Sequence, residues 1–387
     1  MNFVFFSPHF PDYVTEFCVR LSRNGVQVLG IGDVPYDQLR ADLRAALTEY
    51  YRVESMENED QIIRAVGYFT YRYGKIDRFE SLNEYWLELE ARIRTEFNIY
   101  GIKLDFIENL KLKSRMKAYF HKSGVETVRL HKGEDKESAL QFIDLVGYPV
   151  VAKPDTGSGA SMTHKISTPR EFDNFFNNKP VKVPFVLEEF VDGIILTYDG
   201  LVDRYGHVAF ATSHRFEQSI MEVVNRNDHL YYFCLPCIDP EVEKAGRNIL
   251  RALDVRERFF HIELFQRKRD GKIIALEINM RPPGAWMTDA INYTHDIDIY
   301  QQWANLVAFN RVDGPFPGKY FTGYASRKEH HVYRHAHEEI VSTYKILRHA
   351  PVDEIFRRAM GDYAYQFRAK TLEEVREIAA FIQDDYR

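Results

Sequence analysis

The most constraining feature of this chain is a pair of short apolar runs, between residues 261 and 284, whose ends carry acidic residues and an asparagine. The first run is His261-Ile262-Glu263, and the second is Leu276-Glu277-Ile278-Asn279. The alternation of polar and apolar residues on both sides of Asp270-Gly271 predicts a β-hairpin with this dipeptide as its turn. Folding back then brings Glu263 beside Glu277 and Asn279.

Three oxygen ligands on neighbouring strands form a hard site that suits Mg²⁺ bound to phosphates. Arg281 lies two residues beyond Asn279 and extends the row, so it is placed to hold a transferring phosphoryl group. The hairpin therefore predicts a nucleotide–metal site.

Composition limits the other classes of function. The chain has 387 residues, enough for two or three domains, and its 45% hydrophobic and 28% charged residues are ordinary for a globular protein. A net charge of −6 argues against nucleic-acid binding through bulk basicity. No apolar run approaches the roughly 20 residues that cross a bilayer, and the first residues lack a basic leader. Three cysteines cannot form a disulfide framework, so we expect a cytoplasmic protein without a membrane partner.

The order of expected elements divides the chain into three parts. Strands at 2–6, 26–32, 49–53 and 76–79 alternate with helices at 12–24 and 58–73, which predicts a small parallel α/β domain over 1–103. Its first loop has no G-x-G-x-x-G, so a dinucleotide site is not supported. We predict a central region over 104–312, with a smaller lid subdomain at about 125–190. A Gly/Pro-rich boundary at 313–318 then leads to an α+β unit over 313–387.

Within the central region we expect helices at 86–97, 109–123, 135–146 and 239–253. We expect strands near 126–130, 149–153, 164–166, 185–190, 195–202 and 207–213. A mainly helical stretch follows Gly284, and the tail carries strands near 320–327 and 363–368 and a helix at 371–384.

Two lysines are candidates for phosphate binding. Lys153 ends a buried strand and is followed by the glycine-rich loop 155–161, whose amides can cover phosphates from the other side. A lone lysine is usually solvated, but the buried strand and the adjacent loop favour a phosphate role for Lys153. For Lys113 the surrounding sequence does not distinguish a phosphate-binding lysine from a solvated one.

The strand Phe185-Val186-Leu187-Glu188-Glu189-Phe190-Val191 carries two acids and ends in a turn. Such a strand end can offer backbone groups and a carboxylate to an adenine edge. Taken alone, an edge strand with solvated acids is the stronger reading.

Taken together and in order, these motifs resemble the ATP-grasp superfamily, over about residues 1–310. They are Lys113, Lys153 with its glycine loop, Glu188 to Val191, Glu263, and the stretch from Glu277 to Arg281. The closest likeness is to carboxylate–amine ligases, a group that includes L-amino acid ligases and carbamoyl-phosphate-synthase-like proteins. The resemblance implies an α/β and α+β multidomain chain: an ATP-grasp fold with a parallel α/β domain before it and a small α+β unit after it.

The resemblance also implies site roles. Lys113 and Lys153 would bind the α- and β-phosphates of ATP under a loop that includes Gly157, Ser158, Gly159 and Ala160. Adenine would lie against Glu188, Glu189, Phe190 and Val191. Glu263, Glu277 and Asn279 would bind two Mg²⁺ ions, with Mn²⁺ as an alternative. Arg281 would stabilise the γ-phosphate and the acyl phosphate, and His261 is a secondary catalytic candidate.

Two positions depart from the family pattern. Ile195 stands where many members have an acid that binds ribose, which leaves Asp192 and Asp199 as substitutes. Leu112 stands where an Asp usually precedes the first lysine. Neither change removes a metal ligand.

We therefore expect an ATP-dependent ligase that joins a small, amino-acid-like carboxylate to an amine, as a homodimer like many members of the family. A nucleotide-binding module without catalysis and a bicarbonate-using carboxylase are the alternatives.

Three further features have a simpler reading. Cys234 and Cys237 form a C-x-x-C spacing without a second pair, which favours two small apolar residues over a zinc or redox site. His330, His331, His335 and His337 in the tail lack an evident carboxylate partner set, so a solvated basic segment is favoured over a metal site. Arg327 or Arg368 in the tail could bind a substrate carboxylate.

Overall fold

The N-terminal part of the chain forms a separate four-stranded parallel sheet. The computed structural model describes residues 1–157 and 162–386. The strands pair in parallel, as the alternating pattern predicts, and they lie in the order β3-β2-β1-β4. Their bounds are β1 Asn2–Phe6, β2 Gln27–Gly32, β3 Glu49–Arg52 and β4 Arg78–Glu80, and the helices are α1 Val14–Arg23, α2 Ala41–Ala46, α3 Glu59–Tyr73 and α4 Leu87–Glu96, with short 3-10 turns at Tyr36–Gln38 and Glu84–Trp86.

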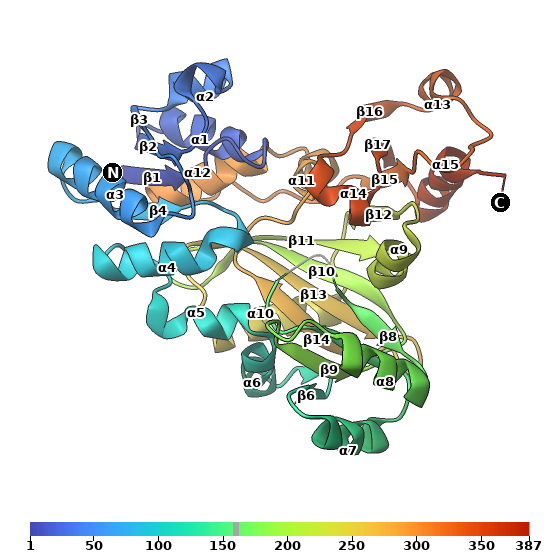
Figure 1. The fold of residues 1–387 in the computed structure, drawn as a ribbon. Coiled ribbons are helices and arrows are strands. Elements are labelled where there is room, and N and C mark those ends of the chain that lie inside the picture. The colour runs from blue at the N-terminus through green and yellow to red at the C-terminus, as the bar shows by residue number, and fades with distance from the viewer. Residues whose placement is uncertain (158–161, 387) are drawn as a thin grey trace.

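A helix from much later in the chain covers one face of this sheet. α12 (Ile299–Phe309) packs beside α1, and Figure 1 shows it in orange against the blue N-terminal strands. Trp303 of α12 lies edge-on to Phe3 and Phe17, with ring centroids 5.8 and 5.1 Å apart. The first domain therefore completes its hydrophobic core with residues from beyond position 298.

A nine-stranded sheet forms the centre of the molecule. Its strand order is β16-β17-β15-β12-β11-β10-β13-β14-β5. The bounds are β5 Glu126–Thr127, β10 Gly193–Val202, β11 Val208–Phe216, β12 Tyr231–Leu235, β13 Arg258–Arg267, β14 Ile273–Asn279, β15 Phe321–Arg327, β16 Ile346–Pro351 and β17 Tyr363–Ala369. The strands of the tail thus continue the central sheet through the pairing of β12 with β15.

Helices border this sheet on several sides. They are α5 Leu104–Lys111, α6 Lys113–Ser123, α9 Ile220–Arg226, α10 Pro240–Ala252, α11 Met287–His295, α13 His337–Thr343, α14 Glu354–Met360 and α15 Leu372–Gln383. The helix predicted at 109–123 is wrong in one respect, because it is two helices, α5 and α6. Leu112 is extended between them (φ −88°, ψ 116°), and Gly124 ends α6 in the left-handed region as a C-cap.

A third, smaller sheet forms a lobe at the bottom of Figure 1. It has the order β6-β9-β7-β8, with β6 Leu130–Lys132, β7 Val150–Pro154, β8 His164–Ile166 and β9 Phe185–Glu189, together with α7 Lys136–Val146 and α8 Pro169–Asn178. The strand predicted near 126–130 is in fact β5 and β6, which belong to different sheets. We call residues 128–190 the β6–β9 lobe.

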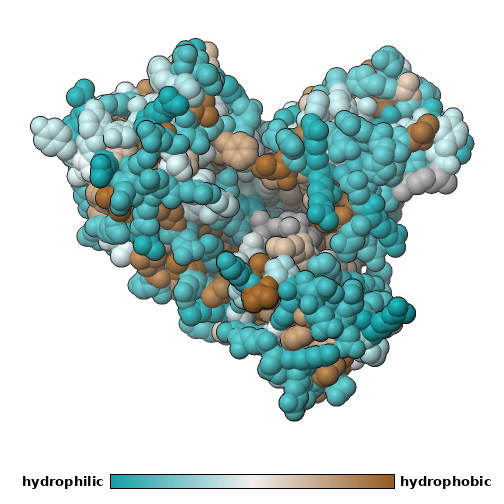
Figure 2. Space-filling model, in the orientation of Figure 1, coloured by the Kyte–Doolittle hydropathy of each residue, from teal (hydrophilic) through white to brown (hydrophobic). Residues whose placement is uncertain are grey.

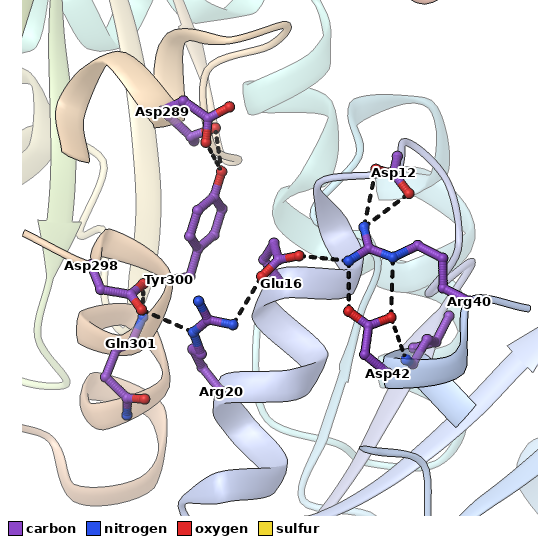
Figure 3. A network of polar contacts seen from close by, with 11 residues as sticks. Asp12, Glu16, Arg20, Arg40, Asp42, Asp289, Asp298, Tyr300 and Gln301 are labelled. Carbon is purple, nitrogen blue, oxygen red and sulfur yellow. Dashed lines mark hydrogen bonds and ion pairs between the residues drawn. The ribbon is translucent and has the colours of Figure 1, made fainter. Parts of the chain in front are cut away.

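Ion pairs join the N-terminal domain to the centre, and they differ in burial. Glu80 at the end of β4 accepts hydrogen bonds from Arg258 of β13, and Arg94 Nη2 lies 2.9 Å from the same Glu80 oxygen. The side chains of Arg258 and Arg94 are 5% and 0% exposed. Figure 3 shows a more exposed network, in which Arg20 of α1 reaches Asp298 at 2.9 Å and Arg40 holds Asp12, Glu16 and Asp42.

Among the described residues, no helix combines the length and the apolar character needed to cross a membrane.

Candidate functional site

The predicted hairpin is formed by β13 and β14, which pair antiparallel. Glu263 lies opposite Glu277, and His261 lies opposite Asn279. The connection is longer than the two-residue turn that the sequence predicts, because Arg267 N–H donates to Lys272 O across it. Gly271 has φ +70°, a conformation that favours glycine. The two carboxylates and the amide therefore stand on adjacent strands, as predicted.

Repulsion between the carboxylates around Glu277 indicates that this cluster can bind cations. Burial raises the pKa of Glu277, and the carboxylates of Glu263 and Glu84 raise it further, while Lys113 opposes them. Burial also acts on Glu263, but His261 and Arg281 outweigh it and lower the pKa of that carboxyl. Acids that repel one another, with an amide beside them, are the donor set that fits Mg²⁺.

His261 lies behind Glu263 in a buried chain of polar groups. Its Nε2 is 3.3 Å from Glu263 Oε1, and its Nδ1 is 2.5 Å from Asp199 Oδ1. Burial opposes protonation of His261, but Asp199 and Glu263 raise its pKa to about 9. On the other side of Asp199, Oδ2 lies 2.8 Å from His214 Nδ1. His261 is therefore held so that it orients Glu263.

The predicted phosphate lysines converge beside the hairpin. Lys113 begins α6, and its Nζ lies 3.6 Å from Glu277 Oε2 and donates to Gly157 O at 2.5 Å. Lys153 on β7 lies 2.7 Å from Glu188 Oε2. Burial opposes the charge of Lys153, but Glu188 and Glu277 outweigh it and raise its pKa. Lys153 is thus held in its charged form, and both lysines lie close to the acidic hairpin.

A third lysine, Lys117, belongs to the same group and was not singled out from the sequence. It lies one turn after Lys113 on α6, and its Nζ is 3.0 Å from Glu188 Oε1 and 3.0 Å from Leu276 O. Burial lowers its pKa to about 8, against the attraction of Glu188. The spacing of four residues from Lys113 was the available signal, because it places both side chains on one helix face.

A cavity of about 720 Å³ opens next to these lysines. Figure 2 shows the molecule hollowed in its middle, between the lobes. Of the predicted residues, those that line the cavity are Lys113, Lys153, Gly157, Glu188, Glu189, Phe190, Val191, Glu263 and Glu277. Residues of α9 and the end of β11 also line it, among them Phe216, Ile220 and Val223. The predicted loop residues Ser158, Gly159 and Ala160 lie outside the described residues.

The predicted adenine strand is already engaged in ion pairs. Glu188 is 3% exposed and lies between Lys117 and Lys153. Glu189 accepts from Arg129 N–H at 2.9 Å and pairs with the Arg129 guanidinium. In this state Glu188 neutralises Lys117 and Lys153, and its contact with adenine stays a prediction.

Of the two ribose substitutes, the structure separates one from the cavity. Asp199 is fully buried between His261 and His214, where a ribose would not reach it. Asp192 lines the cavity together with Ile195 and lies 2.7 Å from Lys268 Nζ.

The N-terminal domain contributes an acid that sequence reasoning did not assign. Glu84, four residues beyond β4, has its Oε2 3.0 Å from Arg281 Nη2. When the side-chain amide of Asn279 is oriented with its nitrogen toward Glu84, that nitrogen donates to Glu84 Oε2 at 2.7 Å. A polar residue just after the end of a parallel strand was the available signal, because ligands collect at that edge. Arg281 therefore lies where the domain and the hairpin meet.

The two cysteines of the C-x-x-C spacing occupy different environments. Cys234 is buried on β12, with its Sγ 3.3 Å from Thr212 Oγ1, whereas Cys237 is exposed. Burial opposes ionisation of Cys234, but His214 and His295 lower its pKa to about 5.

The fold of this chain is of the ATP-grasp class, as comparison with known proteins shows. Residues 146–289 match the family model described as the ATP-grasp domain. Over its whole length the chain superposes on an L-amino acid ligase from Bacillus licheniformis, with a TM-score of 0.73, 16% identity, and coverage of 97% of this chain and 96% of that one. The predicted fold is confirmed.

Two further relatives extend the comparison. An alanine–anticapsin ligase from Bacillus subtilis is 25% identical over 227 residues, which are 53% of this chain and 45% of that ligase. The biotin carboxylase domain of Hydrogenobacter thermophilus 2-oxoglutarate carboxylase, solved with MgADP, ADP and bicarbonate, has a TM-score of 0.67 and 17% identity, and the match covers 94% of this chain and 86% of that one. This chain thus matches less than half the length of the curated ligase. The resemblance to the ATP-grasp superfamily that the sequence predicts is confirmed.

Proposed function

We propose that this protein is an ATP-dependent ligase that activates a small carboxylate as an acyl phosphate and couples it to an amine, releasing ADP and phosphate. The observation that carries the proposal is the pairing of Glu263 with Glu277 beside Lys113 and Lys153, at the inner end of a cavity of about 720 Å³. A nucleoside triphosphate with its metal ions requires acids that bind the metal ions and cations that bind the phosphates. The amino-acid-like nature of the substrates rests on the names of the two ligases.

Each group has a role in this proposal. Glu263, Glu277 and Asn279 would hold two Mg²⁺ ions, which supply Lewis-acid neutralisation of the phosphates. Lys113 and Lys153 bind phosphate oxygens, and Lys117 keeps Glu188 in place beside Lys153. Arg281 lies at the border with the N-terminal domain, where it meets the γ-phosphate and the substrate carboxylate. His261 acts as a positioning residue, because it reaches the reaction only through Glu263.

The order of events follows from the chemistry of these groups. A substrate carboxylate oxygen attacks the γ-phosphorus, the bond to the β,γ-bridging oxygen breaks, and ADP leaves. The amine nitrogen then attacks the acyl carbon, phosphate departs with the bonding electrons, and the amine loses a proton. Lys113 and Lys153 would stabilise charge on the departing ADP. The N-terminal domain would provide the substrate side of the cleft, with Glu84 at its edge.

The domain division at 103 and 312, the lid at about 125–190, the homodimer and the cytoplasmic location remain part of this proposal. The β6–β9 lobe would serve as this lid. The tail sheet, which is continuous with the centre, would support the substrate cleft rather than form a separate body.

The test is phosphate release from Mg²⁺-ATP against pooled amino acids and small carboxylates, with and without amines. Release that needs both an acid and an amine, and that disappears in Glu277→Gln, supports the ligase. A matched control is Glu243→Gln, an exposed acid on α10 that pairs with Arg247. Tight ATP binding without release from any pool would favour a non-catalytic nucleotide-binding module.

The carboxylase has one observation in its favour, the similarity to a biotin carboxylase domain solved with bicarbonate. In the same assay, bicarbonate as the sole added acid would then be sufficient for ADP formation. Dependence on bicarbonate with no response to amino acids would replace the ligase by this alternative.

A further inference from the structure

Two adjacent residues and one from much later in the chain meet at the border between α9 and the tail. Asp228 and His229 lie in the turn between α9 and β12, and His331 follows β15. One potential ligand atom from each lies within 4.8 Å of those of the other two. Asp228 Oδ1 is 3.8 Å from His229 Nδ1 and 4.0 Å from His331 Nδ1. The cluster lies outside the acidic hairpin and takes no part in the function proposed above.

The charges around this cluster favour a cation. A second carboxylate, Asp385, lies 3.2 Å from His331 Nδ1. The side chains of His229 and His331 are only 11% and 7% exposed, and those of Asp228 and Asp385 are 22% and 10% exposed. Two carboxylates that face two imidazoles in a largely buried place attract either protons or a metal ion.

The donor types distinguish this cluster from the hairpin. Two imidazole nitrogens and a carboxylate oxygen suit Zn²⁺ and related transition metals, whereas Mg²⁺ prefers oxygen ligands alone. Ligands at about 2 Å around a tetrahedral ion lie about 3.3 Å from one another. The three atoms therefore need to move together by about 1 Å, which side-chain rotation provides.

The backbone holds the contributing segments in place. Asp228 N–H donates to Val223 O at 3.0 Å, and His331 N–H donates to Lys328 O at 3.1 Å. Tyr333 forms an isolated bridge with Asp385, and its hydroxyl lies 3.2 Å from His229 Nδ1. The ligand-bearing segments are thus fixed by contacts that do not need the ion, as a pre-organised site requires.

The other histidines of the tail contact different partners. His335 stacks on Phe381 and lies 3.0 Å from Glu339, and His337 lies 3.1 Å from the Tyr365 hydroxyl. Of the four histidines that the sequence offered, His331 is the one that meets His229 and Asp228.

From this geometry we infer that Asp228, His229 and His331 form a second metal site, for Zn²⁺ or a similar transition metal, with Asp385 balancing the charge. Asp228 also lines the nucleotide cavity. Occupation of the site therefore fixes α9, which forms one wall of that cavity, against the C-terminal tail.

The test is titration of chelator-treated full-length protein with ZnCl₂, followed by calorimetry and by metal analysis after dialysis. The background variant is Glu277→Gln, which removes competition from the hairpin. We expect one equivalent of Zn²⁺ to remain bound and the midpoint of thermal unfolding to rise with Zn²⁺. His331→Ala and His229→Ala should each weaken binding by about a hundredfold or more, since even outer partners of a metal ligand count for tenfold to a hundredfold.

The matched control is His330→Ala, which removes the neighbouring histidine and should leave Zn²⁺ affinity unchanged. His331→Gln and Asp228→Asn keep the size of the side chains, so they serve if the alanine variants fail to fold. With Co²⁺ bound, the His330→Ala control should show the visible absorption of a tetrahedral site. His331→Gln and Asp228→Asn should not show it.

Two results overturn the inference. One is Zn²⁺ affinity that is the same in His330→Ala, His331→Gln and Asp228→Asn. The other is a protein that binds no Zn²⁺ although these variants lower its stability, which would mean that the imidazoles hold protons and serve only as ion-pair partners.

Discussion

At the scale of single residues, Asp199 shows how one buried charge organises a site. Its carboxylate lies between His261 and His214, and those imidazoles outweigh the burial that opposes its charge, so that the pKa of Asp199 falls well below its ordinary value. In return Asp199 and Glu263 raise the pKa of His261 to about 9. Cys234, together with Asp199, raises the pKa of His214 to about 10. A buried row of alternating charge thus ends at the proposed metal ligand Glu263.

This arrangement predicts a pH dependence of stability. Because the pKa of His261 is raised from 6.5 to about 9, its contribution is fully present below about pH 6.5 and is lost as pH rises through about 9. The shift corresponds to about 3 kcal/mol. Asp199→Asn should therefore lower the free energy of unfolding most at pH 6 and progressively less toward pH 9, as measured by urea unfolding.

The exposed Asp192→Asn is the matched control, and its effect should not vary over this range. A loss in Asp199→Asn that is equal at every pH would contradict the ionisation assigned to the two histidines.

A second residue-level prediction concerns Lys153. Loss of a buried charge-assisted hydrogen bond costs about 2 kcal/mol, so Lys153→Met should weaken ATP binding by about thirtyfold. Lys122→Met removes an exposed lysine of α6 and should leave the dissociation constant unchanged. Calorimetric titration with ATP and Mg²⁺ measures both. Equal affinity in the two variants would remove Lys153 from the phosphate site.

Lys117 shows what the sequence could not supply at this scale. A lysine on a helix is usually solvated, and only the fold reveals that this one reaches Glu188 and Leu276 O. Glu84 is a similar case, because its contact with Arg281 joins positions 197 residues apart. The hairpin acids were predictable, since period-two alternation fixes which strand residues share a face.

At the scale of elements, glycines on two helices illustrate opposite demands. Gly246 lies on α10 against Tyr198, and a Cβ at this position would meet the Tyr198 ring at 2.1 Å. Gly67 lies inside α3, where a Cβ would meet nothing within 4 Å. The same residue type therefore serves close packing in one helix and has no such role in the other.

The two alanine variants should change stability in opposite directions. Gly246→Ala should lower the free energy of unfolding by about 2 kcal/mol, because it overpacks the contact with Tyr198. Gly67→Ala should raise it by up to about 1 kcal/mol, because alanine has the higher helix propensity. Thermal unfolding of both proteins, side by side, gives the comparison. A stabilised Gly246→Ala protein would mean that Tyr198 moves aside freely.

Helices with a clear apolar face and an N-cap were predicted well, whereas elements that depend on contacts with the rest of the fold were not. The ranges 58–73 and 239–253 correspond to α3 and α10, both of which have an apolar face and a side-chain N-cap. The strands β12 and β16 and the helices α8 and α9 were missed. The break at Leu112 was also missed, because no Gly or Pro marks it.

At the scale of the whole molecule, burial decides which ion pairs hold the N-terminal domain. The Glu80–Arg258–Arg94 cluster is nearly inaccessible to water, whereas in the Arg20–Asp298 pair the side chains are 18% and 42% exposed. The domain boundary predicted at residue 103 leaves out α12, which completes the hydrophobic core of the N-terminal domain. A helix that is apolar on most sides does not reveal which of two sheets it will cover.

The two kinds of pair should differ in their contribution to stability. Glu80→Gln leaves Arg258 buried without its paired acid and leaves Arg94 with Glu90 alone, and it should cost about 3 kcal/mol. Arg20→Met removes a water-exposed pair across the same boundary and should cost less than about 1 kcal/mol. Denaturant unfolding followed by circular dichroism measures both. Equal losses would show that the cluster at Glu80 is well hydrated.

The position of Arg258 on β13 has a mechanical consequence. The strand that anchors the N-terminal domain at one end carries His261 and Glu263 a few residues further along. β13 therefore connects the acidic hairpin directly to the N-terminal domain. In the proposed ligase, a nucleotide would then enter and leave through movement of the β6–β9 lobe, which contacts α6 through the pairs Lys117–Glu188 and Lys113–Gly157. Loss of these pairs, together with the hydrogen bonds that Ser114 donates to Asp155, would free the lobe to move while the N-terminal domain and β13 stay in place.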